Sequence, residues 1–154
     1  MFDFETDSDL DRFAWKCRSR FEISPDFSHS GRSSLRFEFH PAERVGFSTG
    51  DVPHDWSAFK SFDFWVYNPS GKTVSLHLQV NRREPDGKFN HLIAEEFEVA
   101  PGPNKISIPL GFARDSKNTQ PRLDKVDGFF IFMQDIPSVT VLYFDSFRLL
   151  GTAG

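Results

Sequence analysis

Hydrophobic and polar residues alternate along much of the chain. In one example, Phe62, Phe64 and Val66 alternate with Asp63 and Trp65. A period of two is typical of a strand that buries one face and exposes the other. The segments that follow this pattern are 34–39, 61–67, 73–82 and 105–110.

Four further segments are predicted as strands from denser or weaker patterns. Residues 129–133 and 139–150 are apolar at most positions, which indicates strands that are buried on both faces. Residues 20–24 and 89–100 show the alternation less clearly. Together with the alternating segments, they leave little of the chain for helices.

Two local features interrupt the strand pattern. At Glu95 and Glu96 the apolar positions change from even to odd numbers, which predicts a β-bulge. Ser8 is a candidate N-cap with acidic residues after it, so one or two helical turns are expected within 8–15.

Turn-forming residues separate the predicted strands. Asn-Pro-Ser-Gly-Lys occupies 68–72, and Pro-Gly-Pro-Asn occupies 101–104. Many short strands without a long helix predict an all-β antiparallel sandwich or barrel. The 154 residues suit a single domain, 1–154, with one core. The loop 111–125 is long for such a domain and is therefore a candidate functional loop.

Pairing of the two best strands predicts a polar surface. If 61–67 and 73–82 form a hairpin around the turn 68–72, Trp65 faces Ser75, and a slip by one residue would bury polar side chains. The face away from the core then carries an unusual mixture of rings, amides and imidazole. Its members are Asp63, Trp65, Tyr67, Ser75, His77, Gln79 and Asn81.

This surface has the chemistry of a carbohydrate platform. Aromatic rings offer an apolar surface to a sugar ring, and neutral polar groups bond to hydroxyls at a small desolvation cost. Trp65 and Tyr67 would stack on sugars. The residues expected to bond to hydroxyls are His77, Gln79, Asn81, Arg82, His91 and Gln134. The alternative is that these residues only cover a second sheet or a loop.

Composition and charge exclude several other functions. The net charge is −4, which disfavours binding to a nucleic-acid backbone. No apolar run is long enough to span a membrane. Cys17 is the only cysteine, so an internal disulfide and a cysteine zinc cluster are excluded. The acidic N-terminus lacks a secretory signal; an extracellular or periplasmic location would follow only if a signal peptide had been removed.

Enzyme chemistry has weak support in the sequence. Glu95 with Glu96, and Asp124 with Asp127, are paired carboxylates of the kind that glycosidases use, but adjacent residues of a strand point to opposite faces. The histidines lack metal-binding spacing, and neither a phosphate-binding loop nor a nucleophile elbow is present. No enzyme activity is expected. The 19 phenylalanines indicate a ring-filled core, which Trp15 and Trp56 are expected to join.

An ordered set of motifs resembles the β-jelly-roll carbohydrate-binding modules of the galactose-binding-like superfamily. The motifs span nearly the whole chain and include Phe-Asp-Phe-Glu (2–5), His-Ser-Gly-Arg-Ser-Ser-Leu-Arg-Phe (29–37), the segment 55–68, the segment 101–110 and Leu-Tyr-Phe-Asp-Ser-Phe-Arg-Leu (142–149). The resemblance implies a two-sheet antiparallel jelly roll without catalytic activity. It also implies binding of a neutral, β-glucan-like polysaccharide or oligosaccharide, and attachment to a glycoside hydrolase.

The resemblance further implies a structural calcium ion away from the sugar. By position, its ligands are Glu5, Ser28, Gly31 and Asp145, which would tie both chain ends to one turn. Asp145 lies within an apolar segment and needs a partner, which an arginine would also satisfy; candidates are Arg20, Arg32 and Arg36. The alternative function is a protein-interaction or assembly domain on the same scaffold, which would expose an apolar patch.

Overall fold

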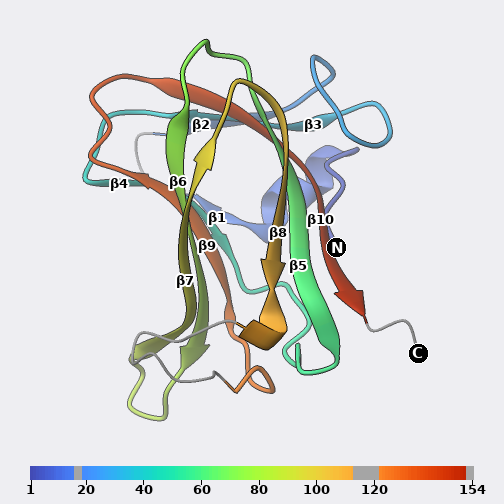
Figure 1. The fold of residues 1–154 in the computed structure, drawn as a ribbon, viewed down its shortest axis with the longest axis vertical. Helices are drawn as coiled ribbons and strands as arrows, with labels where there is room; N and C mark the ends of the chain where they lie inside the picture. Colours follow the sequence, from blue (N-terminus) through green and yellow to red (C-terminus); the bar gives the residue numbers. More distant parts are fainter. Residues whose placement is uncertain (16–18, 113–121, 152–154) are drawn as a thin grey trace.

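Two antiparallel sheets make up the computed structural model, which describes residues 1–15, 19–112 and 122–151 (Figure 1). The strands are β1 (Ala14–Trp15), β2 (Ser19–Ser24), β3 (Ser34–Phe39), β4 (Arg44–Thr49), β5 (Phe59–Asn68), β6 (Val74–Arg83), β7 (Phe89–Val99), β8 (Gly102–Pro109), β9 (Gly128–Gln134) and β10 (Thr140–Gly151). Two short 3-10 helices, η1 (Asp7–Arg12) and η2 (Leu110–Phe112), accompany them.

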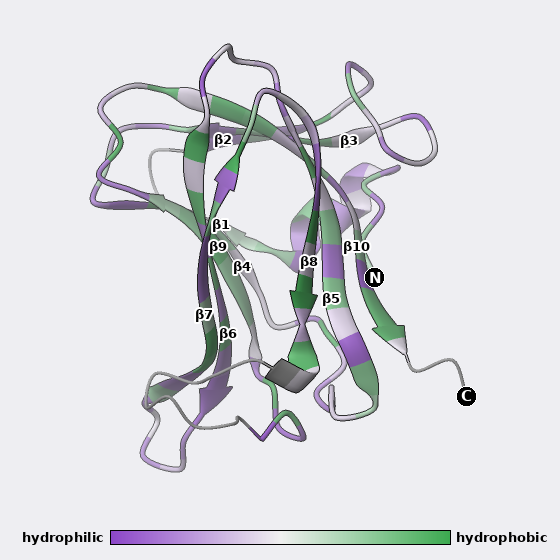
Figure 2. Cartoon of the chain, in the orientation of Figure 1, coloured by the Kyte–Doolittle hydropathy of each residue, from purple (hydrophilic) through white to green (hydrophobic). Residues whose placement is uncertain are grey.

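The strand order defines a first sheet, β1-β4-β9-β6-β7, and a second sheet, β2-β3-β10-β5-β8. All pairs of strands are antiparallel. The prediction of a two-sheet antiparallel sandwich is therefore confirmed. Each sheet has one face on the shared core and one outer face, and Figure 2 shows the resulting alternation of polar and apolar residues along β5.

The predicted hairpin between 61–67 and 73–82 is wrong. β5 pairs with β8 and β10 in the second sheet, whereas β6 pairs with β7 and β9 in the first. The Asn68 amide donates to the carbonyls of Lys72 and Val99, at 2.8 and 3.0 Å. The turn between β5 and β6 therefore carries the chain from one sheet to the other. Alternation fixes which side chains face the core, but it does not identify the neighbouring strand.

Phenylalanine rings fill the space between the sheets. The ring of Phe147 lies 4.9 Å from that of Phe64 and 5.5 Å from that of Phe129. Trp56 is fully buried and its indole N–H donates to the Pro53 carbonyl, which confirms its predicted place in the core. The side chain of Trp15 lies outside the described residues.

Two local predictions are wrong in position. The expected one or two helical turns are present as η1, but the helix begins at Asp7 and its N-cap is Thr6, and β1 follows it within 8–15; the Ser8 hydroxyl shares a hydrogen bond with the Thr6 hydroxyl and does not cap the helix. The irregularity in β7 lies at Leu92 and not at Glu95 and Glu96. Val80 of β6 pairs with Ile93 and Asn81 pairs with His91, so Leu92 is the extra residue between these two pairs. Leu92 and Ile93 are both buried, so the change of phase occurs there.

Two strands, the two-residue β1 and the longer β4, were missed by the sequence prediction. In β4, Val45 and Phe47 point into the core and alternate with Arg44 and Ser48, but the strand has only six residues. Cys17 and most of the loop 111–125 lie outside the described residues. Within the described part of the chain, helices are too short to cross a lipid bilayer.

Candidate functional site

The eight residues predicted to bind ligand do not share one face. Trp65 and Tyr67 point away from the core on β5 of the second sheet, with Phe64 and Val66 facing inward. His77 and the other predicted polar residues belong to the first sheet, and all of them except Arg82 lie on the opposite outer side of the sandwich. A platform that combines both sets is therefore excluded, because β5 and β6 lie in different sheets.

The outer face of the first sheet gathers most of the predicted polar residues. Register places Phe130 of β9 between Ser48 of β4 and Gln79 of β6, and it places Phe132 beside His77. We call this surface the first-sheet face. Its residues are Arg44, Ser48, Ser75, His77, Gln79, Asn81, His91, Ala94, Glu96, Glu98, Phe130, Phe132 and Gln134.

A line of stacked rings crosses the middle of the first-sheet face. The centroids of Phe130 and Phe132 are 4.6 Å apart, and those of His77 and Phe132 are 4.9 Å apart. The guanidinium of Arg44 lies 5.1 Å from the centre of the Phe132 ring, within reach of a cation–π interaction. These neighbours leave Phe132 only 2% exposed, whereas Phe130 is half-buried.

Sequence reasoning did not identify Phe130 or Phe132 as candidate site residues. A run of apolar residues over 129–133 had indicated burial on both faces. In the structure Phe129, Ile131 and Met133 face the core, so the even-numbered rings between them must point outward. The parity of this strand was the signal that could have found them.

A depression of about 310 Å³ lies at one end of this line of rings. Gln79, Asn81, His91, Phe89 and Phe130 contribute to its walls. His91 Nδ1 donates to Asn81 Oδ1 at 2.5 Å, which orients the imidazole and leaves its Nε2 atom for a ligand. The depression therefore combines aromatic surface with neutral donors and acceptors, and Arg44 and Asp127 add one charge of each sign to its walls.

A second depression, of about 580 Å³, lies toward the other end of β6. His77, Gln134 and Ser75 border it, together with residues of the turn between β9 and β10. The first-sheet face thus offers two hollows with the stacked rings between them.

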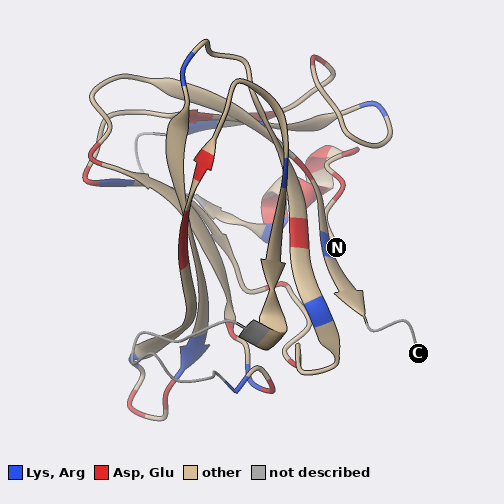
Figure 3. Cartoon of the chain, in the orientation of Figure 1, with Lys and Arg blue, Asp and Glu red and all other residues tan. Residues whose placement is uncertain are grey.

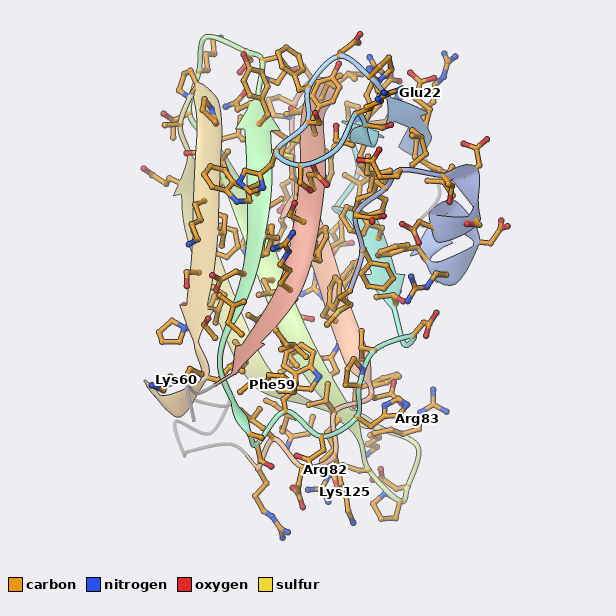
Figure 4. All side chains as sticks on the ribbon, turned by 90° about the vertical axis from the view of Figure 1, so that its right-hand side faces the viewer. Glu22, Phe59, Lys60, Arg82, Arg83 and Lys125 are labelled. Atoms are coloured by element: carbon orange, nitrogen blue, oxygen red, sulfur yellow. The ribbon has the colours of Figure 1, made fainter. Side chains whose placement is uncertain are left out.

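Arg82 does not belong to this face. It has the parity of the inward-facing Val80, and its guanidinium lies 3.5 Å from the Glu84 carboxylate. Figure 4 shows Arg82 and Lys125 at the end of the molecule opposite to Glu22. The expectation that Arg82 closes the polar surface is therefore wrong, because a one-residue step along a strand reverses the face.

A loop covers the two predicted platform rings of the second sheet. The Phe27 ring stacks on Tyr67 with 3.7 Å between centroids, and the His29 ring stacks on Trp65 with 4.1 Å. Residues 25–33, which we call the covering loop, join β2 to β3. A cavity of about 280 Å³ remains beside Trp65 and Tyr67, beneath this loop.

The four residues suggested for calcium meet at the covering loop. The Glu5 carboxylate accepts hydrogen bonds from the backbone N–H of Arg32, at 3.1 Å, and of Ser33, at 3.3 Å. The Gly31 backbone has a φ of 65°, and a Cβ there would lie 2.1 Å from Glu5 Oε1. The Ser28 hydroxyl donates to the Gly31 carbonyl at 3.4 Å.

Asp145 is the buried member of this group, with an exposed fraction of 3%. Its carboxylate accepts from the N–H groups of His29, Ser30 and Ser146, at 2.7–3.0 Å, so its partners in the described chain are backbone groups and not an arginine. Burial raises the pKa of the Asp145 carboxyl, and the negative charge of Glu5 adds to that rise.

These carboxylate, hydroxyl and carbonyl oxygens suit a calcium ion. Calcium takes six to eight hard oxygen ligands, including backbone carbonyls. The repulsion between the charges of Glu5 and Asp145 would be relieved by a cation. The described residues contain no group of three or more His, Cys, Asp or Glu side chains that could hold a metal, so such a site would depend on backbone and hydroxyl oxygens.

The paired carboxylates suspected of catalysis are not arranged for it. Glu95 pairs with the inward-facing Leu78 and Glu96 with the outward-facing His77, so the two glutamates leave β7 on opposite sides. Asp124 forms an ion pair with Arg122 at 3.1 Å. Figure 3 shows the acidic residues of β7 along the edge of the first sheet.

Three large apolar side chains of the described residues are exposed. They are Phe89 on β7, Val139 before β10 and Leu150 near the end of β10.

Comparison with known proteins relates the chain to sugar-binding β-sandwiches. Models of protein families give no match, and no curated protein matches in sequence. Among solved structures, the family 11 carbohydrate-binding module of Clostridium thermocellum, in complex with a β-1,3-1,4-mixed-linked tetrasaccharide, has a TM-score of 0.71 and 14% identity. The match covers 98% of this chain and 94% of that module.

Two other similar structures have different sizes. The family 22 xylan-binding domain of Paenibacillus barcinonensis has a TM-score of 0.60 and 15% identity. The match covers 99% of this chain and 94% of that domain. An exo-β-agarase has a TM-score of 0.74 and 13% identity, and the chain spans only 25% of its length. The chain therefore has the fold of β-sandwich carbohydrate-binding modules.

Proposed function

We propose that this chain is a non-catalytic carbohydrate-binding module that binds a neutral, β-glucan-like polysaccharide or oligosaccharide on the first-sheet face. The observation that carries the proposal is the pair of half-buried rings of Phe130 and His77, which the buried Phe132 holds in one line and which border two hollows with polar walls. Aromatic surface suits the apolar side of a sugar ring, and the neighbouring amides and imidazoles suit its hydroxyls.

The dimensions of this face favour an extended chain. The outward residues of β6 run from Ser75 to Asn81, a length of roughly 20 Å at the usual rise of a strand. Both hollows lie along this path, so several consecutive sugar rings would be in contact at once. A shallow, wet surface of this kind gives modest affinity, about micromolar to millimolar.

The charge distribution favours an uncharged ligand. Glu96 and Glu98 lie outward on β7, beside His77 and Ser75. An acidic polysaccharide would be repelled at this edge, whereas Gln79, Asn81 and other neutral groups incur no such cost.

The proposal includes two partners of the module. The first is a calcium ion held by Glu5, Ser28, Gly31 and Asp145, which would fix the covering loop to the N-terminal segment and to β10; the ion has a structural role and takes no part in sugar contact. The second is an appended glycoside hydrolase domain, supported by the presence of this fold as a quarter of an exo-β-agarase.

Titration with neutral oligosaccharides tests the proposed function. We expect mixed-linked β-glucan or xylan oligosaccharides to bind the parent chain, and Phe130→Ala to weaken the binding about tenfold or more because a stacking surface is lost. Leu150→Ala removes an exposed apolar side chain elsewhere and serves as the matched control, with unchanged affinity expected. Equal affinity of Phe130→Ala and the parent for every oligosaccharide would contradict the proposal.

A further inference from the structure

The cavity beneath the covering loop has walls made of aromatic rings. Trp65 and Tyr67 rise from β5, Tyr143 comes from the adjacent strand β10, and Phe27 belongs to the covering loop. Pro103 of β8 closes the opposite side. A volume of about 280 Å³ is at the small end of ligand pockets, so it suits one ring better than a chain.

Polar groups lie among these rings. The cavity is also lined by Ser28, His29, Ser34 and Asp145. His29 Nδ1 shares a hydrogen bond with the Ser146 hydroxyl at 3.1 Å, which leaves Nε2 for another partner. The Ser34 hydroxyl donates to the Phe27 carbonyl, so it helps to hold the loop.

We propose that this cavity is a second ligand site, which takes a single neutral sugar ring at the end of a glycan chain. A pyranose ring has apolar faces for the aromatic walls and hydroxyls for the Nε2 atom of His29. The Asp145 carboxylate disfavours an anionic ligand at this place. The site differs from the first-sheet face in location, because it lies on the outer side of the other sheet.

The covering loop explains why a chain end is selected. Stacking of Phe27 on Tyr67 and of His29 on Trp65 lays the loop across the outer face of β5. The N–H groups of His29 and Ser30, bonded to Asp145, fix the loop to β10. An extended polysaccharide would collide with the loop, whereas a terminal ring can enter beside it.

Two sites on opposite sheets would let the module hold a chain interior on one side and a chain end on the other. Two such contacts on one insoluble polysaccharide would raise the effective affinity through multivalency. This inference does not depend on the first-sheet face, since the residues of the two sites do not overlap.

Monosaccharide titration followed by NMR tests the second site. The probes are methyl β-glucoside, methyl β-galactoside and methyl β-xyloside, and the signal is the indole N–H resonance of Trp65, assigned by its absence in Trp65→Phe. We expect at least one glycoside to shift this resonance in a saturable way, and Trp65→Ala to weaken the binding about tenfold.

A second variant separates the two sites. Phe130→Ala, which alters the first-sheet face, should weaken oligosaccharide binding as expected above and still show the Trp65 shift. If Trp65→Ala does not fold, the titration of the parent chain decides alone. The inference is overturned if no glycoside moves the Trp65 resonance at saturating concentration, or if Phe130→Ala abolishes the shift in a folded protein.

Discussion

The two outer faces of the sandwich arise from the same alternation but offer different surfaces. On the first sheet, Phe130 and Gln79 line an open hollow. On the second sheet, Trp65 and Tyr67 lie beneath a loop that is stacked on them. An aromatic ring at an outward position is therefore not by itself a binding platform for a sugar chain. A loop that crosses the ring limits the length of the ligand that can contact it.

Charge also distinguishes the two faces. On the second sheet, Arg36 of β3 bonds to Glu38 at 2.8 Å and lies 3.8 Å from Glu22 of β2. On β5, the buried Asp63 accepts a hydrogen bond from the Ser107 hydroxyl at 2.8 Å. These groups satisfy one another within the protein, whereas the hollow beside Phe130 has the amides of Gln79 and Asn81 and the imidazole of His91 together with one charge of each sign, Arg44 and Asp127.

The largest expected effect is a difference in the free energy of unfolding between variants of two neighbouring rings of β9. Phe129 is 1% exposed in the core and Phe130 faces outward. We expect Phe129→Ala to lower the free energy of unfolding by about 3–5 kcal/mol, because it leaves a cavity among packed rings. Urea denaturation measures this change. For Phe130→Ala we expect a loss of less than about 1 kcal/mol, and similar losses in both variants would contradict the assignment of faces.

Calcium should affect stability chiefly through the second-sheet side. We expect calcium at 100 times its Kd to raise the free energy of unfolding by about 2.7 kcal/mol, and a chelator to reverse the gain, because the ion would bind only the folded chain. Thermal melts with calcium or chelator measure it.

Two carboxylate variants control the calcium experiment. Asp145→Ala should remove the sensitivity to calcium, whereas Asp63→Asn changes another buried carboxylate of the same sheet and should keep it. A melt of the parent chain that does not respond to chelator would reject the calcium site.

The smallest expected effect is on the pH dependence of stability, through the charged residues Arg36 and Glu38 of β3. The hydrogen bond from Arg36 lowers the pKa of the Glu38 carboxyl. A carboxyl whose pKa is lower in the folded chain stabilises the fold above its unfolded pKa, and this contribution is lost as the pH falls through the folded value. We therefore expect Glu38→Gln to flatten the acid side of the pH–stability curve slightly. Curves of the two proteins that superimpose below pH 5 would contradict this role.

The pattern of the sequence was sufficient to predict the strands but not their neighbours. The alternation over 61–67 and 73–82 correctly indicated β5 and β6, since it depends only on burial of one face. Their pairing depended on the turn 68–72, where bonds from Asn68 lead the chain across the core. The predicted site was consequently divided between two sheets.

The candidate site shows the same division. Local parity correctly grouped His77, Gln79 and Asn81, because residues two apart on a strand share a face. It did not reveal Phe130 beside them, because β9 is distant in sequence and its dense apolar run hides the outward positions.

The sequence by itself determined an all-β chain, the phase of most of its strands and a core rich in phenylalanine. The tertiary structure alone decided which strands became neighbours, which outer face stayed open and where the covering loop lies. The physical reason is that side-chain alternation is a local property, whereas strand pairing and loop coverage depend on contacts between residues far apart in the chain.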